Sequence, residues 1–201
     1  MSENSRTGVA SRKTAETQVR VEVSIDPPAG GTQHVKTGLP FFDHLLTAFA
    51  RHARLGLVID ATGDLEIDAH HTVEDTGIVL GQALRQALGD RTGIERMGHD
   101  YVPMDEALVR AAFDLSGRSY LVFRVAVPGV YVPTLDLTVI EGFFKALCDS
   151  LGANLHVDAL AGRDYHHVVE ATFKAVGRAF RNAARSDGTG RLASTKEALD
   201  G

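Results

Sequence analysis

Apolar and polar residues alternate strictly along ETQVRVEVSID (residues 16–26), which is the pattern of a β-strand with one buried face. The segment ALVRAAFDLSGRSYLVFRVAV (residues 107–127) predicts a pair of strands that turn at SGR. Two other segments each predict an amphipathic helix, a glycine-containing turn and a short apolar strand. They are LPFFDHLLTAFARHARLGLVID (residues 39–60) and VIEGFFKALCDSLGANLHVDAL (residues 139–160). A similar order of elements therefore occurs twice in the chain.

An internal repeat follows these segments. HHTVEDTGIVLGQALRQA (residues 70–87) aligns with HHVVEATFKAVGRAFRNA (residues 166–183) at a shift of 96 residues, with nine identities in eighteen positions. Shared helix propensity does not explain identities at apolar and polar positions alike, so we infer a duplication. The pattern predicts an α+β fold of two similar β-β-α-β-α halves, residues 1–95 and residues 96–201, fused in one compact unit. The polar, Gly/Ser-rich C-terminal segment predicts a flexible tail.

Composition excludes several classes of protein. The 201 residues are 44% hydrophobic, enough for one medium domain or two small fused ones with a real core. A formal net charge of −5 without long Lys/Arg runs argues against nucleic-acid binding. No apolar run approaches the roughly 20 residues that span a bilayer, and no apolar signal segment stands at the N-terminus, so we expect a cytoplasmic protein without a membrane partner. Cys148 lies in an apolar helical segment and is expected to be buried and reduced.

The repeated HHxxE motif has the residue types of a metal site. Asp68 and Asp164 have N-cap character, so each motif is expected to open a helix, with the glutamate one turn from both histidines. Adjacent helical side chains diverge by about 100°, so two neighbouring histidines are better placed to serve two ions than one. Four imidazoles and two carboxylates form a mixed N/O set suited to Mn, Fe, Zn or Ni rather than Ca or Mg.

A single pair of histidines is equally well explained as part of a capped surface helix. The duplication changes this balance, because both histidines and the glutamate are kept while Asp75 and Gly77 have become Ala171 and Phe173. Metal binding is therefore the favoured interpretation.

Five further histidines fall into two groups. His44 follows Asp43, which could orient its second ring nitrogen, and His52 stands two turns later on the same predicted helix face. His34, His99 and His156 have no partner at ligand spacing and are expected to be surface or structural residues.

Several cations are candidate phosphate ligands. Lys174 stands opposite Ile78 in the repeat, one turn beyond Glu170. The other candidates are Arg96, Arg118 and the STK segment of Ser194 to Lys196. Each alone is typical of a solvated surface charge, and only their convergence in space would make a site.

Long motifs in this chain resemble the imidazoleglycerol-phosphate dehydratase family of histidine biosynthesis, in the same order and over nearly the whole chain. They are LPFFDHLLTAFARH, IDAHHTVEDTGIVLGQAL, PMDEAL, DLSGRSY, LHVDALAGRDYHHVVEATFKAVGRAF and the terminal STK. The resemblance implies helices packed between two mixed sheets, a fold similar to domain 2 of ribosomal protein S5. It also implies two Mn²⁺ per chain, bound between the subunits of a homo-oligomeric 24-mer.

The resemblance also implies roles for individual residues. The metal ligands would be His44, His70, His71, Glu74, His166, His167 and Glu170. The positions that contact substrate would be Glu16, His52, Arg96, Arg118, Lys174, Ser194 and Lys196, with the cations serving the phosphate. Glu16, His71 and His167 would be catalytic.

The implied reaction is the dehydration of imidazole glycerol phosphate to imidazole acetol phosphate by a lyase. The hydrogen to be removed is on a carbon with no carbonyl beside it, so the imidazole ring must accept the electrons. Two Lewis acids, one on each ring nitrogen, would stabilise an imidazolate that expels the hydroxyl group and becomes a diazafulvene. Glu16 and a metal-bound hydroxide are alternative bases for the C–H proton, and the sequence does not separate them.

The chain departs from the family pattern at two places. Gly142 stands where the family commonly has His or Glu, at the half-chain equivalent of His44, so that metal position would be filled by water, by the neighbouring Glu141 or not at all. The usual PSTKG reads ASTKE, with Ala193 and Glu197. Two other functions stay open on the sequence alone. One is a dinuclear phosphate-ester hydrolase, and the other is a metal-organised assembly protein with lost or altered activity.

Overall fold

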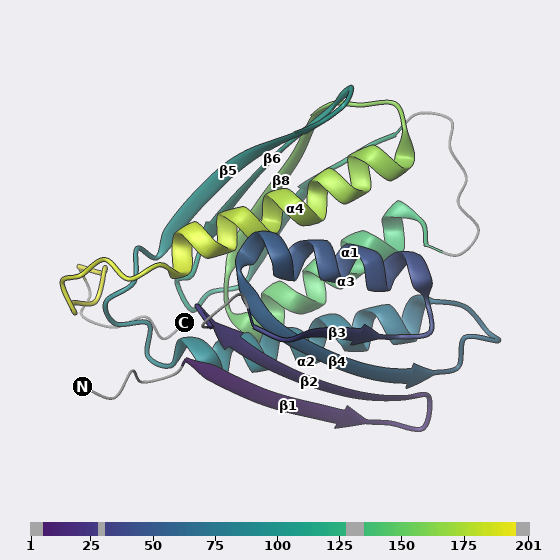
Figure 1. Cartoon of the computed structure of the whole chain (residues 1–201), viewed down its shortest axis with the longest axis horizontal. Coiled ribbons are helices and arrows are strands. Elements are labelled where there is room, and N and C mark those ends of the chain that lie inside the picture. The colour runs from purple at the N-terminus through teal and green to yellow at the C-terminus, as the bar shows by residue number, and fades with distance from the viewer. Residues whose placement is uncertain (1–5, 28–30, 128–134, 196–201) are drawn as a thin grey trace.

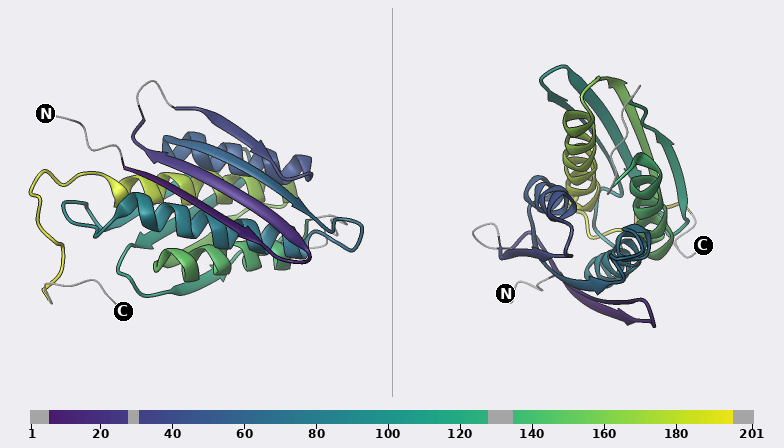
Figure 2. Two further views of the ribbon diagram at one scale, coloured as in Figure 1. Left: turned by 90° about the horizontal axis from the view of Figure 1, so that it is seen from below. Right: turned by 90° about the vertical axis from the view of Figure 1, so that its right-hand side faces the viewer.

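The computed structural model describes residues 6–27, 31–127 and 135–195, in which four helices lie between two four-stranded sheets (Figures 1 and 2). The first half contains β1 (Thr7–Lys13), β2 (Thr17–Ile25), β3 (Gln33–Lys36), α1 (Pro40–Ala53), β4 (Leu55–Gly63) and α2 (His70–Leu88). The second contains β5 (Met97–Met104), β6 (Ala107–Asp114), β7 (Tyr120–Arg124), α3 (Leu137–Leu151), β8 (Asn154–Ala161) and α4 (Tyr165–Ala184). The predicted α+β architecture is confirmed.

Both sheets have the same topology, with strand orders β1-β2-β4-β3 and β5-β6-β8-β7. The edge strands β3 and β7 run parallel to β4 and β8, and all other pairs are antiparallel. A helix connects each parallel pair, as a crossover requires. The prediction that β6 and β7 pair across SGR is wrong, because β8 lies between them.

Each half also has one strand more than predicted, so its order is β-β-β-α-β-α. The short edge strand β3 has only half-buried and exposed residues, and β5 contains Pro103 among several polar residues. Edge strands of this kind carry a weak hydrophobic pattern, which is why the sequence did not reveal them.

The helix ends agree only in part with the expected caps. Asp164 is the N-cap of α4 and accepts a hydrogen bond from the His167 backbone N–H, and Gly152 ends α3 in the left-handed conformation, as predicted. Asp68 is not an N-cap, because α2 begins one residue later than such a cap would allow and Asp68 Oδ1 accepts from the His70 N–H at 2.7 Å. Helix α1 ends on a left-handed Arg54 rather than on a glycine.

The helices pack mainly across the two halves, α1 on α4 and α2 on α3. Glycines permit the close approach. A Cβ atom on Gly177 of α4 would lie 2.6 Å from the carbonyl oxygen of Phe49 in α1. A Cβ atom on its repeat partner Gly81 would lie 2.6 Å from the carbonyl oxygen of Leu147 in α3. Since each helix pair joins the two halves, neither half has a helical layer of its own.

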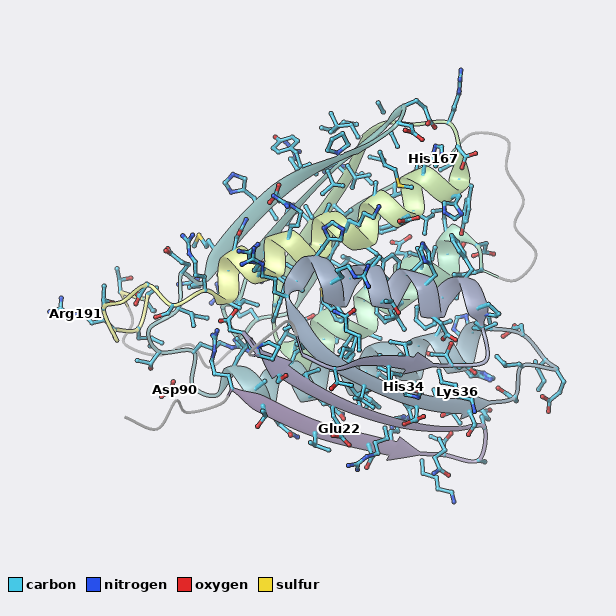
Figure 3. The ribbon with its side chains drawn as sticks, in the orientation of Figure 1. Glu22, His34, Lys36, Asp90, His167 and Arg191 are labelled. Carbon is cyan, nitrogen blue, oxygen red and sulfur yellow. The ribbon has the colours of Figure 1, made fainter. Side chains whose placement is uncertain are left out.

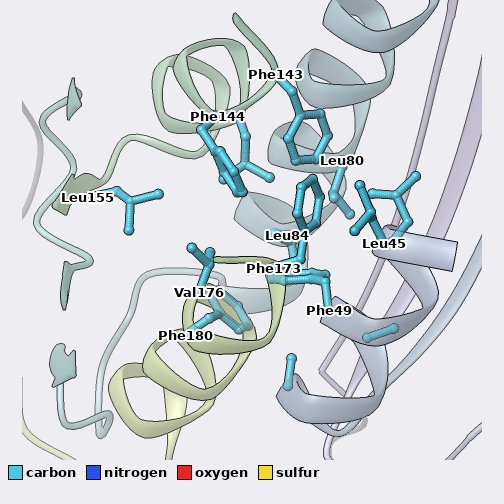
Figure 4. Packing of buried hydrophobic residues seen from close by; sticks show 14 of the residues in the cluster. Leu45, Phe49, Leu80, Leu84, Phe143, Phe144, Leu155, Phe173, Val176 and Phe180 are labelled. Carbon is cyan, nitrogen blue, oxygen red and sulfur yellow. The ribbon is translucent and has the colours of Figure 1, made fainter. Parts of the chain in front are cut away.

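One hydrophobic core fills the space between the sheets (Figure 4). Phe173 of α4 lies 5.6 Å from Phe143 and 5.0 Å from Phe144 of α3 between ring centroids. Cys148 is fully buried, and burial raises the pKa of its thiol to about 12, in agreement with the prediction of an inert reduced cysteine. Among the described residues, no helix has the length and apolar character to cross a membrane.

Substitution of the packed glycine should destabilise the fold. We expect Gly177→Ala to lower the free energy of unfolding by about 1–3 kcal/mol, because backbone atoms of α1 would have to move to admit the methyl group. The matched control is Gly142→Ala in α3, where an added Cβ meets no atom of the described residues within 4 Å. That variant should gain roughly 0.5–1 kcal/mol from helix propensity. Thermal denaturation at one fixed metal concentration compares them, and equal stabilities would contradict the packing argument.

Candidate functional site

Two imidazoles converge on one carboxylate where α1 packs against α4. His44 Nε2 lies 3.0 Å from Glu170 Oε2, and His166 Nε2 lies 2.9 Å from the same oxygen. The nearest donor atoms of the three side chains are all within 4.8 Å of one another. His44 comes from the first half and the other two residues from the second, so the helix pairing assembles this group.

Glu170 is the buried member of the group, and its side chain is only 9% exposed. Burial opposes ionisation, but hydrogen bonds from Lys174 and His44 outweigh it and lower the pKa of Glu170 to about 2. Lys174 Nζ binds the other carboxylate oxygen, Oε1, at 2.7 Å. The carboxylate is ionised at neutral pH and lies beside two imidazole nitrogens. Together these groups provide the donor atoms that divalent transition-metal ions prefer.

The first repeat motif has a looser arrangement. His70 Nε2 lies 3.8 Å from Glu74 Oε2, and both side chains are about half exposed. In the second motif the equivalent pair is His166 and Glu170, which His44 also contacts. The glutamate of the second motif therefore has two imidazole partners at short distance, whereas that of the first motif has, within the described residues, a single, longer contact.

The second histidine of each motif is held by a carboxylate from outside the motif. His71 Nδ1 lies 3.0 Å from Asp64 Oδ2, and this hydrogen bond is the main cause that raises the pKa of His71. Glu16 Oε2 is further away, at 3.8 Å from the same nitrogen. A proton on Nδ1 leaves Nε2 as the free lone pair, which is the arrangement typical of metal-ligating histidines.

His167 has the same kind of support from Glu106. Its Nδ1 lies 2.8 Å from Glu106 Oε2, while Glu106 Oε1 accepts from the backbone N–H groups of Arg163 and Asp164 at 3.1 and 2.8 Å. The Asp164 N–H, followed by the imidazole, lowers the pKa of Glu106 to about 2. The hydrogen bond to Glu106 in turn raises the pKa of His167. Three hydrogen bonds thus fix this carboxylate and the ring that it holds.

Sequence reasoning missed both Asp64 and Glu106. The available signal was an acidic residue at a turn, since Glu106 stands directly before β6 and Asp64 directly after β4. Asp43, which was expected to orient His44, accepts hydrogen bonds from the backbone N–H and the hydroxyl of Thr37 instead.

Of the predicted phosphate cations that the structure describes, Lys174 lies beside the histidines, and Arg96 and Arg118 do not. Lys174 contacts Glu170, but Arg96 lies at the far end of α4, where its backbone N–H donates to Ala183 O. Arg118 is exposed beside the C-terminal end of α3, since its neighbour Gly117 bonds to Gly152. Figure 3 shows His167 at one end of α4 and Arg191, in the segment that contains Ser194, at the opposite end of the molecule.

Arg96 is already paired in the chain. Its guanidinium binds both oxygens of Asp114, at 2.7 and 3.1 Å, and donates to the carbonyl oxygen of Ala193 at 2.7 Å. This contact fixes the segment next to Ser194. Lys196 lies outside the described residues.

The remaining histidines separate as expected. His34, His99 and His156 are exposed on the strands β3, β5 and β8. His52 is half-buried, and burial, followed by the charges of Lys174 and Arg178, lowers its pKa. A neutral imidazole therefore stands among cations on the face of α1 that turns toward α4.

Comparison with known proteins gives consistent matches. The family model described as imidazoleglycerol-phosphate dehydratase matches residues 37–180. The enzyme of that name from Pelotomaculum thermopropionicum is 49% identical over 194 residues, which cover 96% of this chain and 98% of the relative. The one from Limosilactobacillus fermentum is 51% identical over 178 residues, or 89% of this chain and 91% of the relative.

Two solved structures of that enzyme are also similar to the present one. The structure from Staphylococcus aureus has a TM-score of 0.79 at 37% identity and covers 90% of this chain and 99% of its own. The structure from Pyrococcus furiosus has a TM-score of 0.83 at 36% identity and covers 94% of this chain and 99% of its own.

Removal of the Glu106 carboxylate should be visible at His167. In metal-free protein we expect Glu106→Gln to lower the pKa of His167, because a neutral amide no longer favours the imidazolium ion. NMR titration of histidine-labelled protein, with the signal assigned from a His167→Gln variant, measures the change. Asp105→Asn is the matched control, since Asp105 Oδ2 is 3.5 Å from Nε2 and is a minor cause of the shift. An unchanged pKa in Glu106→Gln would contradict the role of this hydrogen bond.

Proposed function

The chain belongs to the imidazoleglycerol-phosphate dehydratase family, and we propose that it performs this dehydration with two divalent transition-metal ions bound between copies of the chain. The enzyme is a hydro-lyase of histidine biosynthesis, which converts imidazole glycerol phosphate to imidazole acetol phosphate. The observation that supports metal binding most directly is the convergence of His44, His166 and Glu170. We propose Mn²⁺ as the ion and the cytoplasm as the location.

The ions would supply Lewis-acid stabilisation of the negative charge on the substrate imidazole ring. The chain would hold one ion mainly by His44, His166 and Glu170, and the other by His70 and Glu74. His71 and His167 present Nε2 as ligands, because Asp64 and Glu106 hold the protons on Nδ1. These assignments use both halves of the duplication for one reaction.

Glu16 is the proposed general base for the C–H proton. It stands in the turn between β1 and β2, its side chain is 56% exposed, and it lies 3.8 Å from the imidazole of His71. Since Asp64 already accepts the proton of His71, the carboxylate of Glu16 is available to substrate.

The separation of the site residues supports an active site shared between chains. Helix α4 runs for 20 residues, which is about 30 Å at 1.5 Å per residue. The metal ligands stand at its N-terminal end, while Arg96 and the segment of Ser194 lie beyond its C-terminal end. A small substrate cannot reach both ends, so we propose that Arg96, Arg118, Ser194 and Lys196 bind the phosphate of a substrate held by another copy. The proposed assembly is the 24-mer.

The sites of dinuclear phosphate-ester hydrolases usually include a bridging aspartate, and the aspartate within the repeated motif is Asp75. Its carboxylate is instead bound by the hydroxyl of Thr17 and by Arg12 Nε, the latter at 2.9 Å. This residue ties α2 to the first sheet. A phosphatase assay beside the dehydratase assay should therefore detect turnover only in the latter.

Replacement of the second histidine in either HHxxE motif should remove activity. We expect His71→Ala and His167→Ala each to reduce kcat by at least about a hundredfold, since even outer partners of metal ligands contribute about 10–100-fold. Competition by inorganic phosphate should persist in part, because the proposed phosphate ligands lie elsewhere. The control is His99→Ala, at an exposed position on β5. Full activity in either variant of the motif would refute its proposed role.

Removal of metal should also disperse the assembly. Ions bound between chains couple metal binding to association, so a chelator is expected to shift the protein to smaller species. Light scattering after size-exclusion chromatography, with and without chelator, measures the change, and re-addition of Mn²⁺ is the control for reversibility. An assembly of unchanged mass after complete metal removal would contradict the shared site.

A further inference from the structure

The two helix pairs make their contacts in the same register. Phe49 in α1 and Leu147 in α3 hold equivalent places, because each presents its carbonyl oxygen to a repeated glycine of the partner helix. Five residues toward the N-terminus from these positions stand His44 in α1 and Gly142 in α3. The packing therefore establishes, independently of any relative, that a glycine occupies the position equivalent to His44.

Because Gly142 replaces a histidine at this position, the two ligand sets of the chain are unequal. In one set Glu170 is nearly buried and accepts contacts from His44 and His166 at 3.0 and 2.9 Å. In the other set Glu74 is 50% exposed, and its one ion-pair partner among the described residues is His70, at 3.8 Å. Gly142 adds no donor there, and a Cβ atom at this position would meet none of the described residues within 4 Å. Within the described part of the chain, the space for a third ligand side chain is therefore open.

We propose that the chain binds its two metal ions with different affinities, tightly at His44, His166 and Glu170 and weakly at His70 and Glu74 beside Gly142. This inference rests on the proposed function, which requires two ions. Its chemical basis is the number of imidazoles at the glutamate of each set, which among the described residues is two at Glu170 and one at Glu74. The weak set is the one that loses its ion when metal becomes scarce.

The positive charge of Lys174 opposes tight binding of a metal ion at Glu170. The ammonium of Lys174 binds Glu170, whereas the equivalent position in the first half is Ile78, so at this position of the repeat only the tight set has a cation. Lys174 contacts Oε1, however, whereas both imidazoles contact Oε2. Its flexible stem allows the ammonium to move away as an ion binds, whereas a glycine has no means of supplying an imidazole. The missing ligand therefore determines the order of the two affinities.

Graded removal of metal tests the proposal. Full-length protein loaded with Mn²⁺ is dialysed against increasing concentrations of EDTA, and the manganese per chain is measured by elemental analysis. Wild-type protein should lose one ion per chain first and the second only at a free-metal level roughly tenfold or more lower, by analogy with the affinity cost of lost ligand support. Gly142→His should lose both ions together, near the level of the tighter wild-type ion.

Two variants serve as matched controls. Gly142→Ala adds a side chain without a donor atom and should keep the two-step loss of the wild type. His44→Gly creates the same gap in the other set, so both ions should be lost at low chelator concentration, and this arm does not depend on the folding of Gly142→His.

The outcomes distinguish the inference from the proposed function. Loss of both wild-type ions in one step would overturn the inference while leaving two bound ions intact. Identical profiles for Gly142→His and Gly142→Ala would overturn it as well. Wild-type protein that retains no manganese before chelator is added would refute the proposed function instead.

Discussion

Close contact between helices of opposite halves is the constraint on which the fold and the site both depend. Gly81 and Gly177 let α2 reach the backbone of α3, and α4 that of α1. As a consequence, the carboxylate of Glu170 in the second half meets an imidazole from the first half. The set of His44, His166 and Glu170 is built from both halves, so either half alone would leave it incomplete. The buried phenylalanines of α3 and α4 strengthen the same arrangement by forming one core instead of two.

Both repeats keep the proposed metal ligands, but the carboxylate that binds the second histidine comes from a different position in each repeat. In the second half, Glu106 at the start of β6 holds His167 through a 2.8 Å hydrogen bond. In the first half, Glu16 stands at the matching place before β2, but Asp64 holds His71 in its stead. Because Asp64 holds the imidazole of His71, the carboxylate of Glu16 is not needed to orient it and stands near the proposed substrate. Divergence between repeats is therefore consistent with one carboxylate that orients a proposed ligand and a counterpart that is the proposed base.

The long axis of α4 separates the proposed metal ligands from the proposed phosphate ligands. An isolated chain would have two half-sites near opposite ends of α4, and Figure 3 shows His167 and Arg191 at these two ends of the molecule. Closed assemblies solve this geometric problem, because the end of one copy can meet the opposite end of another. The chain would then gain activity only by association, and the ions would link the two processes.

The sequence by itself determined the duplication, the α+β class, the buried cysteine and the histidine–glutamate motifs, because these depend on local periodicity and on residue identity. It did not determine the strand order, since β7 pairs with β8 rather than with its sequence neighbour β6. Nor did it reveal Asp64 and Glu106 as partners of the histidines. A hydrogen bond between a turn and a helix depends on where the adjacent strands place that turn. Only the tertiary structure showed, without reference to any relative, that Gly142 matches His44, and only it showed that Arg96 and Arg118 lie far from the imidazoles. Both facts follow from helix packing, and helix packing is set by contacts between residues distant in the chain.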